Sequence, residues 1–234
     1  MSKNQQVLID SLPTGKLTAS NYRLVETDLP TLAEGEVLVK TIAFAITAGT
    51  RAGLQGSASY AGAPTTGVVM NSTGVGEVVE SKAQGFAPGD RVIGPMGWQA
   101  FSAQKADDLT LLNPAYDPVD YLGPLGVNGL TAYFGLLRVG QPAAGETVMV
   151  SAAAGSVGHL VGQIAKIQDA RVVGVCGSDA KGQVLTGQLG FDAVANYKDP
   201  NYRDLLKAAT PDGVDVYFDN TGGSILGSAL FRMN

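Results

Sequence analysis

Residues 151–166 read SAAAGSVGHLVGQIAK and directly follow ETVMV at positions 146–150. The apolar run predicts a buried strand, and the spacing of apolar residues from Ser156 onward predicts a helix. Between the two, residues 153–158 have the form AxGxxG. Such a turn from strand to helix is typical of dinucleotide sites, because the helix N-terminus offers N–H groups and positive potential to phosphates. The stretch therefore predicts an α/β domain that binds a nucleotide.

The residues of this turn have separate expected roles. Gly155 is expected to let the backbone approach a pyrophosphate, and Gly158 to let the helix pack closely on the strand. Ala153 is a mild departure from the usual glycine, because alanine adopts a positive φ less readily. The flanking strand and helix favour a nucleotide site over the alternative, a turn that serves only packing.

The helix after the turn has one apolar side. We expect this side to bury five residues, Val157, Leu160, Val161, Ile164 and Ile167. His159 lies off this side and is expected to be a solvated surface residue, with a functional role as the alternative.

The character of the sequence changes near its middle. Before NPAYDP (113–118), short apolar or alternating runs predict a β-rich domain that forms a small barrel. After it, apolar residues stand at helical spacing, at Leu130, Tyr133, Phe134 and Leu137. Four apolar runs, TVMVSA, ARVVGVCG, FDAVANY and GVDVYFDN, then alternate with helical segments and predict a parallel, doubly wound sheet. We expect domains at residues 1–120 and 121–234.

Composition excludes several classes of protein. The 234 residues are 45% hydrophobic and 16% charged, as expected of a folded chain. No apolar run approaches the ~20 residues of a membrane span, and the opening residues lack the order of a signal peptide, so we expect a cytoplasmic protein. A net charge of −5 without a basic run argues against nucleic-acid binding. One cysteine, Cys176, and one histidine cannot form the usual zinc site, so we expect no metal.

The choice of coenzyme depends on the end of the next strand. In dinucleotide sites, an acidic residue about 20 residues past the turn binds the ribose 2′-hydroxyl. Here that place reads CGS (176–178), so a 2′-phosphate is not repelled, and Ser178 and Lys181 can bind it by hydrogen bond and charge. Asp179 lies close by but is expected to act as the N-cap of the following helix. The sequence therefore favours NADP over NAD.

Together these residues resemble the medium-chain dehydrogenase/reductase superfamily, specifically its zinc-independent alkenal/one reductase branch of prostaglandin reductases, plant double-bond reductases and curcumin-reductase-like enzymes. The resemblance covers nearly all of residues 5–223, and is carried by NYRLVETDLPTLAEGEVLVKT, PGDRV, GLTAYFGLL, GETVMVSAAAGSVGHLVGQIAK, VVGVCGSDAK, LGFDAVANYKD and PDGVDVYFDNTGG. It implies an N-terminal GroES-like barrel, which holds substrate and catalytic groups, and a Rossmann domain, with NADPH in the cleft between them. The cofactor residues that it implies are Gly155, Ser156, Val157 and Gly158 for the turn, Lys181 and Tyr197 for the 2′-phosphate, and Asn220 near the cofactor.

The resemblance also implies a reaction on a small molecule. Hydride passes from nicotinamide C4 to the β-carbon of an enone or enal, and the α-carbon is then protonated. The catalytic residues stay unknown, since many relatives read DPYMR where this chain has TAGTR (47–51), which leaves Thr50 and Arg51 to be tested. Two alternatives remain open: a quinone reductase of the same superfamily, and a truncated, non-catalytic nucleotide-binding protein.

The family pattern extends beyond this sequence. It continues through two more Rossmann strands and returns to the first domain, whereas Asn234 lies in an apparent amphipathic helix, so we expect an incomplete Rossmann domain. A sheet that ends at its fourth strand is expected to expose an edge and an apolar face. Relatives commonly dimerise through their last Rossmann strand, and the resemblance leaves open whether the full-length form is a homodimer.

Overall fold

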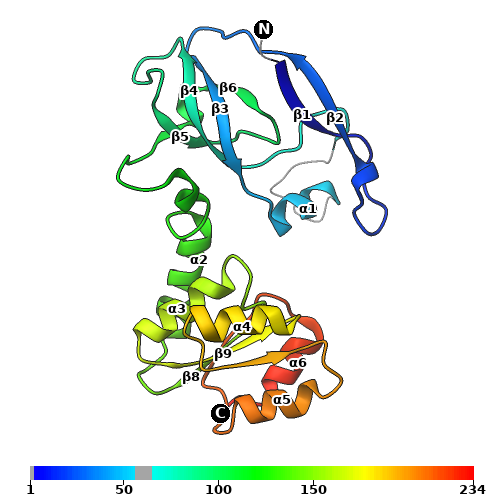
Figure 1. The fold of residues 1–234 in the computed structure, drawn as a ribbon, viewed down its shortest axis with the longest axis vertical. Helices are drawn as coiled ribbons and strands as arrows, with labels where there is room; N and C mark the ends of the chain where they lie inside the picture. The colour runs from blue at the N-terminus through cyan, green and yellow to red at the C-terminus, as the bar shows by residue number, and fades with distance from the viewer. Residues whose placement is uncertain (1–2, 56–64) are drawn as a thin grey trace. The chain divides into compact units, whose positions relative to one another are not determined.

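The computed structural model of the protein describes residues 3–55 and 65–234. The chain divides into two compact units, Met1–Leu122 and Gly123–Asn234 (Figure 1). None of the helices in the described ranges has the length and apolar character needed to cross a membrane. The predicted fold class, a β-rich first half followed by a parallel α/β second half, is confirmed.

The first unit consists mainly of antiparallel strands. In its described part, β1 and β2 form a hairpin, and five further strands form one sheet in the order β6-β3-β4-β5-β7. The Val7 N–H of β1 donates to the Trp98 carbonyl, and the Met70 N–H donates to the Val7 carbonyl, which ties the hairpin to the segments between the sheet strands. Within the described residues, the strands of this unit form two separate sheets and do not close into one continuous barrel. The elements are β1 (Lys3–Ile9), β2 (Tyr22–Asp28), β3 (Glu36–Phe44), α1 (Ala48–Leu54), β4 (Gly74–Ser81), β5 (Arg91–Gly94), β6 (Phe101–Lys105) and β7 (Thr110–Leu111), with 3₁₀ turns η1 (Ala19–Asn21), η3 (Ala106–Asp108) and η4 (Pro118–Leu122).

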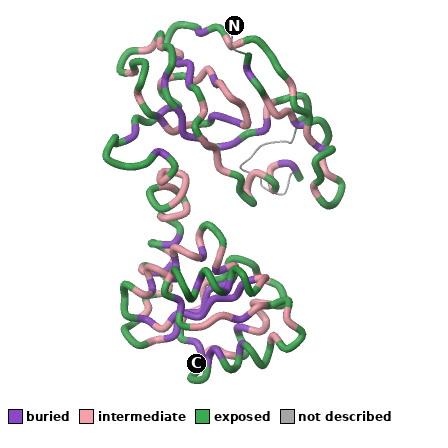
Figure 2. Tube along the Cα trace, in the orientation of Figure 1, coloured by how far each residue is buried: buried purple, intermediate pink, exposed green. Residues whose placement is uncertain are grey.

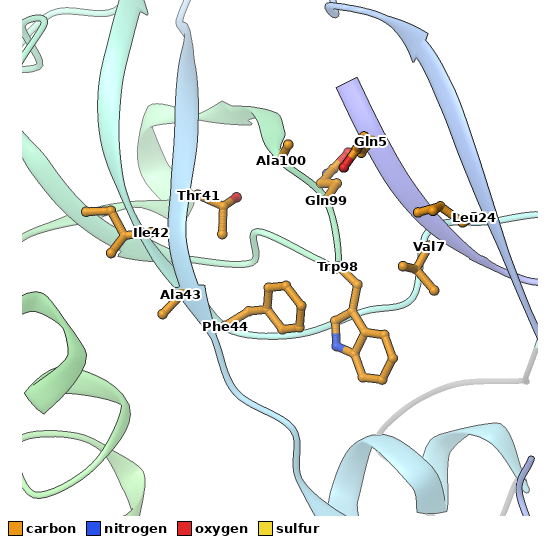
Figure 3. Close-up of a pocket in the computed structure, with 10 residues that line it drawn as sticks. All are labelled: Gln5, Val7, Leu24, Thr41, Ile42, Ala43, Phe44, Trp98, Gln99 and Ala100. Atoms are coloured by element: carbon orange, nitrogen blue, oxygen red, sulfur yellow. The ribbon is translucent and has the colours of Figure 1, made fainter. Parts of the chain in front are cut away.

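The core of this unit follows the two-residue period of its strands. Val37 and Val39 of β3 are buried against Val78, Val92 and Met96. Elsewhere in the unit, the Trp98 ring lies 5.3 Å from that of Tyr22 and 5.6 Å from that of Phe44, measured between centroids. An open hollow of about 450 Å³ lies beside these rings (Figure 3), lined by Gln5, Val7, Leu24, Thr41, Ile42, Ala43, Phe44, Trp98, Gln99 and Ala100.

The second unit, all of whose residues are described, is built on a parallel sheet. Its strands have the order β10-β9-β8-β11, and all four correspond to the runs predicted from the sequence. The elements are α2 (Val127–Phe134), the π-helical η5 (Gly135–Gly140), β8 (Thr147–Val150), α3 (Gly158–Ile167), β9 (Arg171–Cys176), α4 (Asp179–Gln188), β10 (Ala193–Asn196), α5 (Tyr202–Ala209), β11 (Val216–Phe218) and α6 (Gly223–Leu230).

Helices cover both faces of this sheet, so the predicted doubly wound arrangement is confirmed. Val148 and Val150 of β8 pack on the side of α3 and α4, whereas Met149 packs on the side of α5 and α6. The strands between these layers are largely buried (Figure 2). The chain moves from β8 to β9 and β10, then returns to β11 on the other side of β8. The carboxyl ends of β8 and β11 therefore flank the switch point, where open α/β sheets bind ligands.

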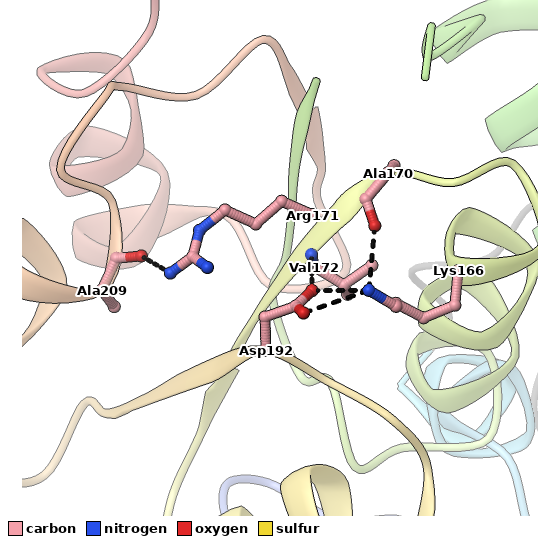
Figure 4. Close-up of polar contacts among 6 residues, drawn as sticks. All are labelled: Lys166, Ala170, Arg171, Val172, Asp192 and Ala209. Carbon is pink, nitrogen blue, oxygen red and sulfur yellow. Dashed lines mark hydrogen bonds and ion pairs between the residues drawn. The ribbon is translucent and has the colours of Figure 1, made fainter. Parts of the chain in front are cut away.

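A polar cluster fixes the opposite, amino edge of the sheet (Figure 4). The Asp192 carboxylate accepts a 2.6 Å hydrogen bond from the Val172 N–H and forms a 2.9 Å ion pair with Lys166. The Arg171 guanidinium donates to the Ala209 carbonyl at 3.0 Å. Burial alone raises the pKa of Asp192, but the Val172 N–H and the Lys166 ammonium outweigh it and lower that pKa below its usual value.

Two details of the second unit differ from the sequence predictions, and a third is confirmed. The helix α3 begins at Gly158 rather than Ser156, because residues 151–157 form a turn. Ile167 is 75% exposed, since it is the last residue of α3 and has passed the covered part of the sheet. The predicted helical spacing near residue 130 is confirmed, although Leu130, Tyr133 and Phe134 are each at least half exposed.

The last residues do not lie in a helix, contrary to the prediction. α6 ends at Leu230, and Met233 then forms a parallel bridge with Val214. Asn234 donates from its side chain to the Asp215 carboxylate at 2.7 Å. Residues 231–234 thus begin to pair beside the segment that leads into β11.

Candidate nucleotide site

The turn after β8 is shaped by its small residues. Ala152, and not Ala153, adopts a positive φ, of 45°. Ala153 is fully buried and does not have a positive φ, so the departure from glycine at this position costs no left-handed strain. A Cβ built on Gly158 would lie 2.4 Å from the Ala152 carbonyl oxygen and 2.8 Å from Ala153 Cα. Gly158 therefore allows the close approach of α3 to the turn, the packing role that its position predicted.

The open side of this turn presents unpaired backbone donors. Gly155 and Ser156 are exposed, and a Cβ on Gly155 would meet only Ala152, at 3.0 Å or more. Within the described ranges, no protein acceptor hydrogen-bonds to the amides of Ser156, Val157 and Gly158. Three successive amides at the start of a ten-residue helix form an arrangement that suits a phosphate.

The loop after β9 positions the residues expected at a 2′-phosphate. Ser178 is the N-cap of α4, and its hydroxyl accepts from the Lys181 N–H at 3.4 Å. The prediction that Asp179 caps this helix is therefore wrong, because the residue before it takes that place. Asp179 is the first residue of α4, and its carboxylate instead accepts a 2.9 Å bond from the Asn196 side chain. The Lys181 side chain is exposed on the first turn.

Tyr197 lies against the same loop. Its N–H donates to the Cys176 carbonyl at 3.0 Å, which extends the pairing of β10 with β9 by one residue. A Cβ built on Gly177 would lie 2.9 Å from the Tyr197 hydroxyl. A side chain at position 177 would displace this phenol. The glycine therefore allows Tyr197 to lie at the end of β9, close to the first turn of α4 that carries Lys181.

Asn220 is fixed at the switch point by Ser151, the residue that follows β8. The Ser151 hydroxyl accepts from the Asn220 N–H at 2.7 Å and donates to the Asp219 carboxylate at 2.9 Å. The Asn220 side-chain amide donates to the Ser151 carbonyl at 2.9 Å. These bonds join the carboxyl ends of β8 and β11 and place Asn220 beside the turn of residues 152–158.

Asp219 is the most strongly perturbed acid of this unit. Partial burial raises the pKa of its carboxyl, but donors from Gly222, Thr221, Tyr217 and Ser151 outweigh burial and lower the pKa to about 2. Burial raises the pKa of Tyr217 to about 12. At neutral pH the carboxylate is therefore ionised and the phenol is a donor, with 2.9 Å between them.

Other residues named from the sequence lie elsewhere. His159 is half-buried and its Nδ1 lies 2.8 Å from the Gly155 carbonyl oxygen, so it is bonded within its own helix turn. In the first unit, Thr50 lies in α1 and its hydroxyl pairs with that of the N-cap Thr47 at 2.8 Å, and Arg51 is exposed. Across the described ranges, no three His, Cys, Asp or Glu side chains are grouped so that they could hold a metal ion.

Sequence reasoning missed Ser151, Asp219 and Asn196. Asp219 precedes Asn220-Thr221-Gly222, and its carboxylate accepts the N–H groups two and three residues ahead. An aspartate before such a turn is a recognisable signal. Ser151 and Asn196 offered none, because their partners are 68 or 69 and 17 residues away along the chain.

Two family models match the chain. One describes the N-terminal domain of oxidoreductase and matches residues 5–112, and the other describes a zinc-binding dehydrogenase and matches residues 156–233. The chain is 42% identical to the putative NADP-dependent oxidoreductase YfmJ of Bacillus subtilis, over 100% of this chain and 69% of that protein. It is 38% identical to the NADPH-dependent curcumin reductase of Escherichia coli, over 99% and 68%, and 40% identical to prostaglandin reductase 1 of Mus musculus, over 92% and 65%.

Solved structures of oxidoreductases are also similar to this chain. CurA from Vibrio vulnificus, in complex with NADPH, has a TM-score of 0.92 at 34% identity, over 98% of this chain and 68% of that one. The Escherichia coli quinone oxidoreductase complexed with NADPH has a TM-score of 0.73 at 22% identity, over 98% and 70%, which shows the fold alone.

The chain belongs to the medium-chain dehydrogenase/reductase superfamily of oxidoreductases. Within that superfamily it belongs to the zinc-independent branch that contains curcumin reductase and prostaglandin reductase 1. It spans about two thirds of the length of these relatives.

Proposed function

We propose that the protein is an NADPH-dependent reductase that reduces the C=C bond of α,β-unsaturated ketones or aldehydes. The observation that carries the proposal is the likeness, at 38–40% identity, to relatives named for curcumin and prostaglandin reduction. The quinone oxidoreductase structure matches at 22% and supports only the fold.

The second unit supplies the residues that would hold the coenzyme. The amides of Ser156, Val157 and Gly158, with the open backbone at Gly155, suit the pyrophosphate. Lys181 supplies a positive charge and Tyr197 a hydroxyl beside the loop after β9, which suits a 2′-phosphate.

Asn220 has a defined orientation at the switch point, which is the place where open α/β sheets bind their ligands. Its N–H and its side-chain amino group both donate to Ser151, so the side-chain oxygen is the polar group of Asn220 that could still accept a hydrogen bond from a nucleotide.

NADPH supplies the hydride when it is bound, and the protein supplies binding and orientation. The three turn amides would hold the pyrophosphate of the coenzyme, and the hydrogen bonds from Asn220 to Ser151 orient Asn220. Positioning of this kind lowers the barrier because reacting groups are held at the correct distance before reaction.

The test compares the turnover of several classes of acceptor by the protein. NADPH oxidation is followed with trans-2-alkenals, benzylidene-type enones and benzoquinones, and NADH serves as the control coenzyme. We expect turnover of the enals and enones with NADPH. Turnover of quinones alone would contradict the proposal, and tight NADPH binding without turnover of any acceptor would favour a non-catalytic nucleotide-binding protein.

A further inference from the structure

A hydrogen bond between α4 and β10 fixes the only acidic side chain on the first turn of α4. Asn196 Nδ2 donates to Asp179 Oδ1 at 2.9 Å. The orientation of the Asn196 amide is set by a second bond, since its oxygen accepts from the Lys198 N–H at 3.1 Å. A backbone N–H can only donate, so the Asn196 oxygen must face Lys198 and its amino group must face Asp179.

The charges of Asp179 and Lys181 both affect Cys176, the last residue of β9. The pKa of the Cys176 thiol is raised by burial, lowered by the Lys181 ammonium and raised by the Asp179 carboxylate. Both residues lie on the first turn of α4, directly after the loop that Cys176 begins. A 2′-phosphate bound here would be attracted by Lys181 and repelled by Asp179.

The position of one carboxylate therefore bears on the choice of coenzyme. A carboxylate free to turn toward the ribose would repel a 2′-phosphate and would accept a hydrogen bond from a 2′-hydroxyl, the interaction that selects NAD. Asn196 is half-buried at the end of β10, and its two hydrogen bonds limit this freedom.

We propose that Asn196 determines coenzyme specificity by holding the Asp179 carboxylate on β10, so that Lys181 alone faces the 2′-phosphate. Asn196 is then a positioning residue that acts through Asp179. The inference rests on the proposed NADPH-dependent function and extends it from the residues that bind the phosphate to one that keeps an opposing charge away.

The test measures dissociation constants rather than turnover. NADPH and NADH are titrated by calorimetry into the wild type, Asn196→Ala, Asp179→Ala and the double variant. We expect Asn196→Ala to weaken NADPH binding about two- to fivefold, the range of exposed charge interactions, and to leave NADH binding equal or tighter. In the Asp179→Ala background, the same substitution is expected to change the ratio of the NADPH and NADH dissociation constants less than about 1.5-fold, the lower end of that range.

The dependence of NADPH binding on salt distinguishes a charge effect from a loss of packing, because a loss of packing would not depend on ionic strength. The effect of Asn196→Ala on NADPH is expected to be larger at an ionic strength of about 0.01 M than at about 0.15 M, because the Debye length falls from about 30 to 8 Å. Equal weakening of both coenzymes, or the same effect with and without Asp179, would overturn the proposal. If Asn196→Ala does not fold, Asn196→Ser replaces it, with and without the Asp179→Ala substitution.

The wild-type titration separates this inference from the proposed function. A wild type that does not prefer NADPH contradicts both. A wild type that prefers NADPH, with an Asn196→Ala variant of unchanged preference, contradicts only the role of Asn196.

Discussion

The Ser151 hydroxyl donates a 2.9 Å hydrogen bond to Asp219, a residue 68 positions further along the chain. The same oxygen accepts from the Asn220 N–H at 2.7 Å. Ser151 is fully buried, whereas Asp219 and Asn220 are exposed, so both bonds are shielded from water on the Ser151 side only. The bond therefore links the strand that leads into the glycine turn to the strand that carries Asn220.

Replacement of Ser151 by alanine is expected to destabilise the protein by about 1–3 kcal/mol, because it leaves the Asn220 N–H without its acceptor. Urea unfolding followed by circular dichroism measures the loss. Ser156→Ala is the matched control, since Ser156 is exposed in the same turn. A similar loss in both variants would mean that the buried bonds are not its cause.

Gly158→Ala is expected to destabilise the protein by about 1–3 kcal/mol, as overpacking does in a tight site. The added Cβ would lie 2.4 Å from the Ala152 carbonyl oxygen, and the backbone must move to accept it. Gly187→Ala on α4 is the control. It meets nothing within 4 Å and is expected to stabilise by about 0.5–1 kcal/mol. Thermal unfolding of the two variants should shift in opposite directions.

Lys181→Ala is expected to weaken NADPH binding by about 10- to 100-fold, the range of a charge-assisted hydrogen bond, and NADH binding much less. Fluorescence titration of both coenzymes measures the difference. Lys207→Ala is the control, because Lys207 is an exposed lysine of α5 on the opposite side of the sheet. An equal loss for NADPH and NADH would show that the 2′-phosphate assignment is wrong.

Stability is expected to fall between about pH 4 and pH 2, and Asp219 contributes to this fall. Its pKa is about 2 in the folded protein, below the usual value of about 3.9 in an unfolded chain. The stabilisation is therefore fully present above the unfolded pKa and is lost as the pH falls toward the folded pKa. Unfolding midpoints of wild type and Asp219→Asn, measured from pH 6 to pH 2.5, should converge at the acid end. Parallel curves would contradict this contribution.

The sequence was sufficient for the strands of the second unit and for the packing role of Gly158. Buried parallel strands are continuous apolar runs, and a glycine at the start of a helix after such a run is typical of close packing between helix and strand. The placement of Tyr197 and Lys181 at one loop needed the family resemblance, because residues 16 positions apart reach the same place only once β10 is paired with β9.

The errors have physical causes that no local pattern contains. Ser178 and Asp179 are both good N-caps; Ser178 takes that place, and the Asp179 carboxylate instead bonds to Asn196 on the next strand, a partner 17 residues away. The positive φ of the turn falls on Ala152, the residue before the AxGxxG pattern begins. The exposure of Ile167 depends on where the sheet ends, which periodicity along a helix cannot give.

The Lys166–Asp192 ion pair and Arg171 lie at the amino edge of the sheet, whereas Ser151, Asn196 and Asn220 lie at its carboxyl edge. A strand of six residues such as β9 separates the edges by roughly 20 Å. Substitutions this far apart have nearly additive free energies. An engineer can therefore change the coenzyme preference of this unit at one edge and restore lost thermal tolerance at the other, in independent rounds of selection.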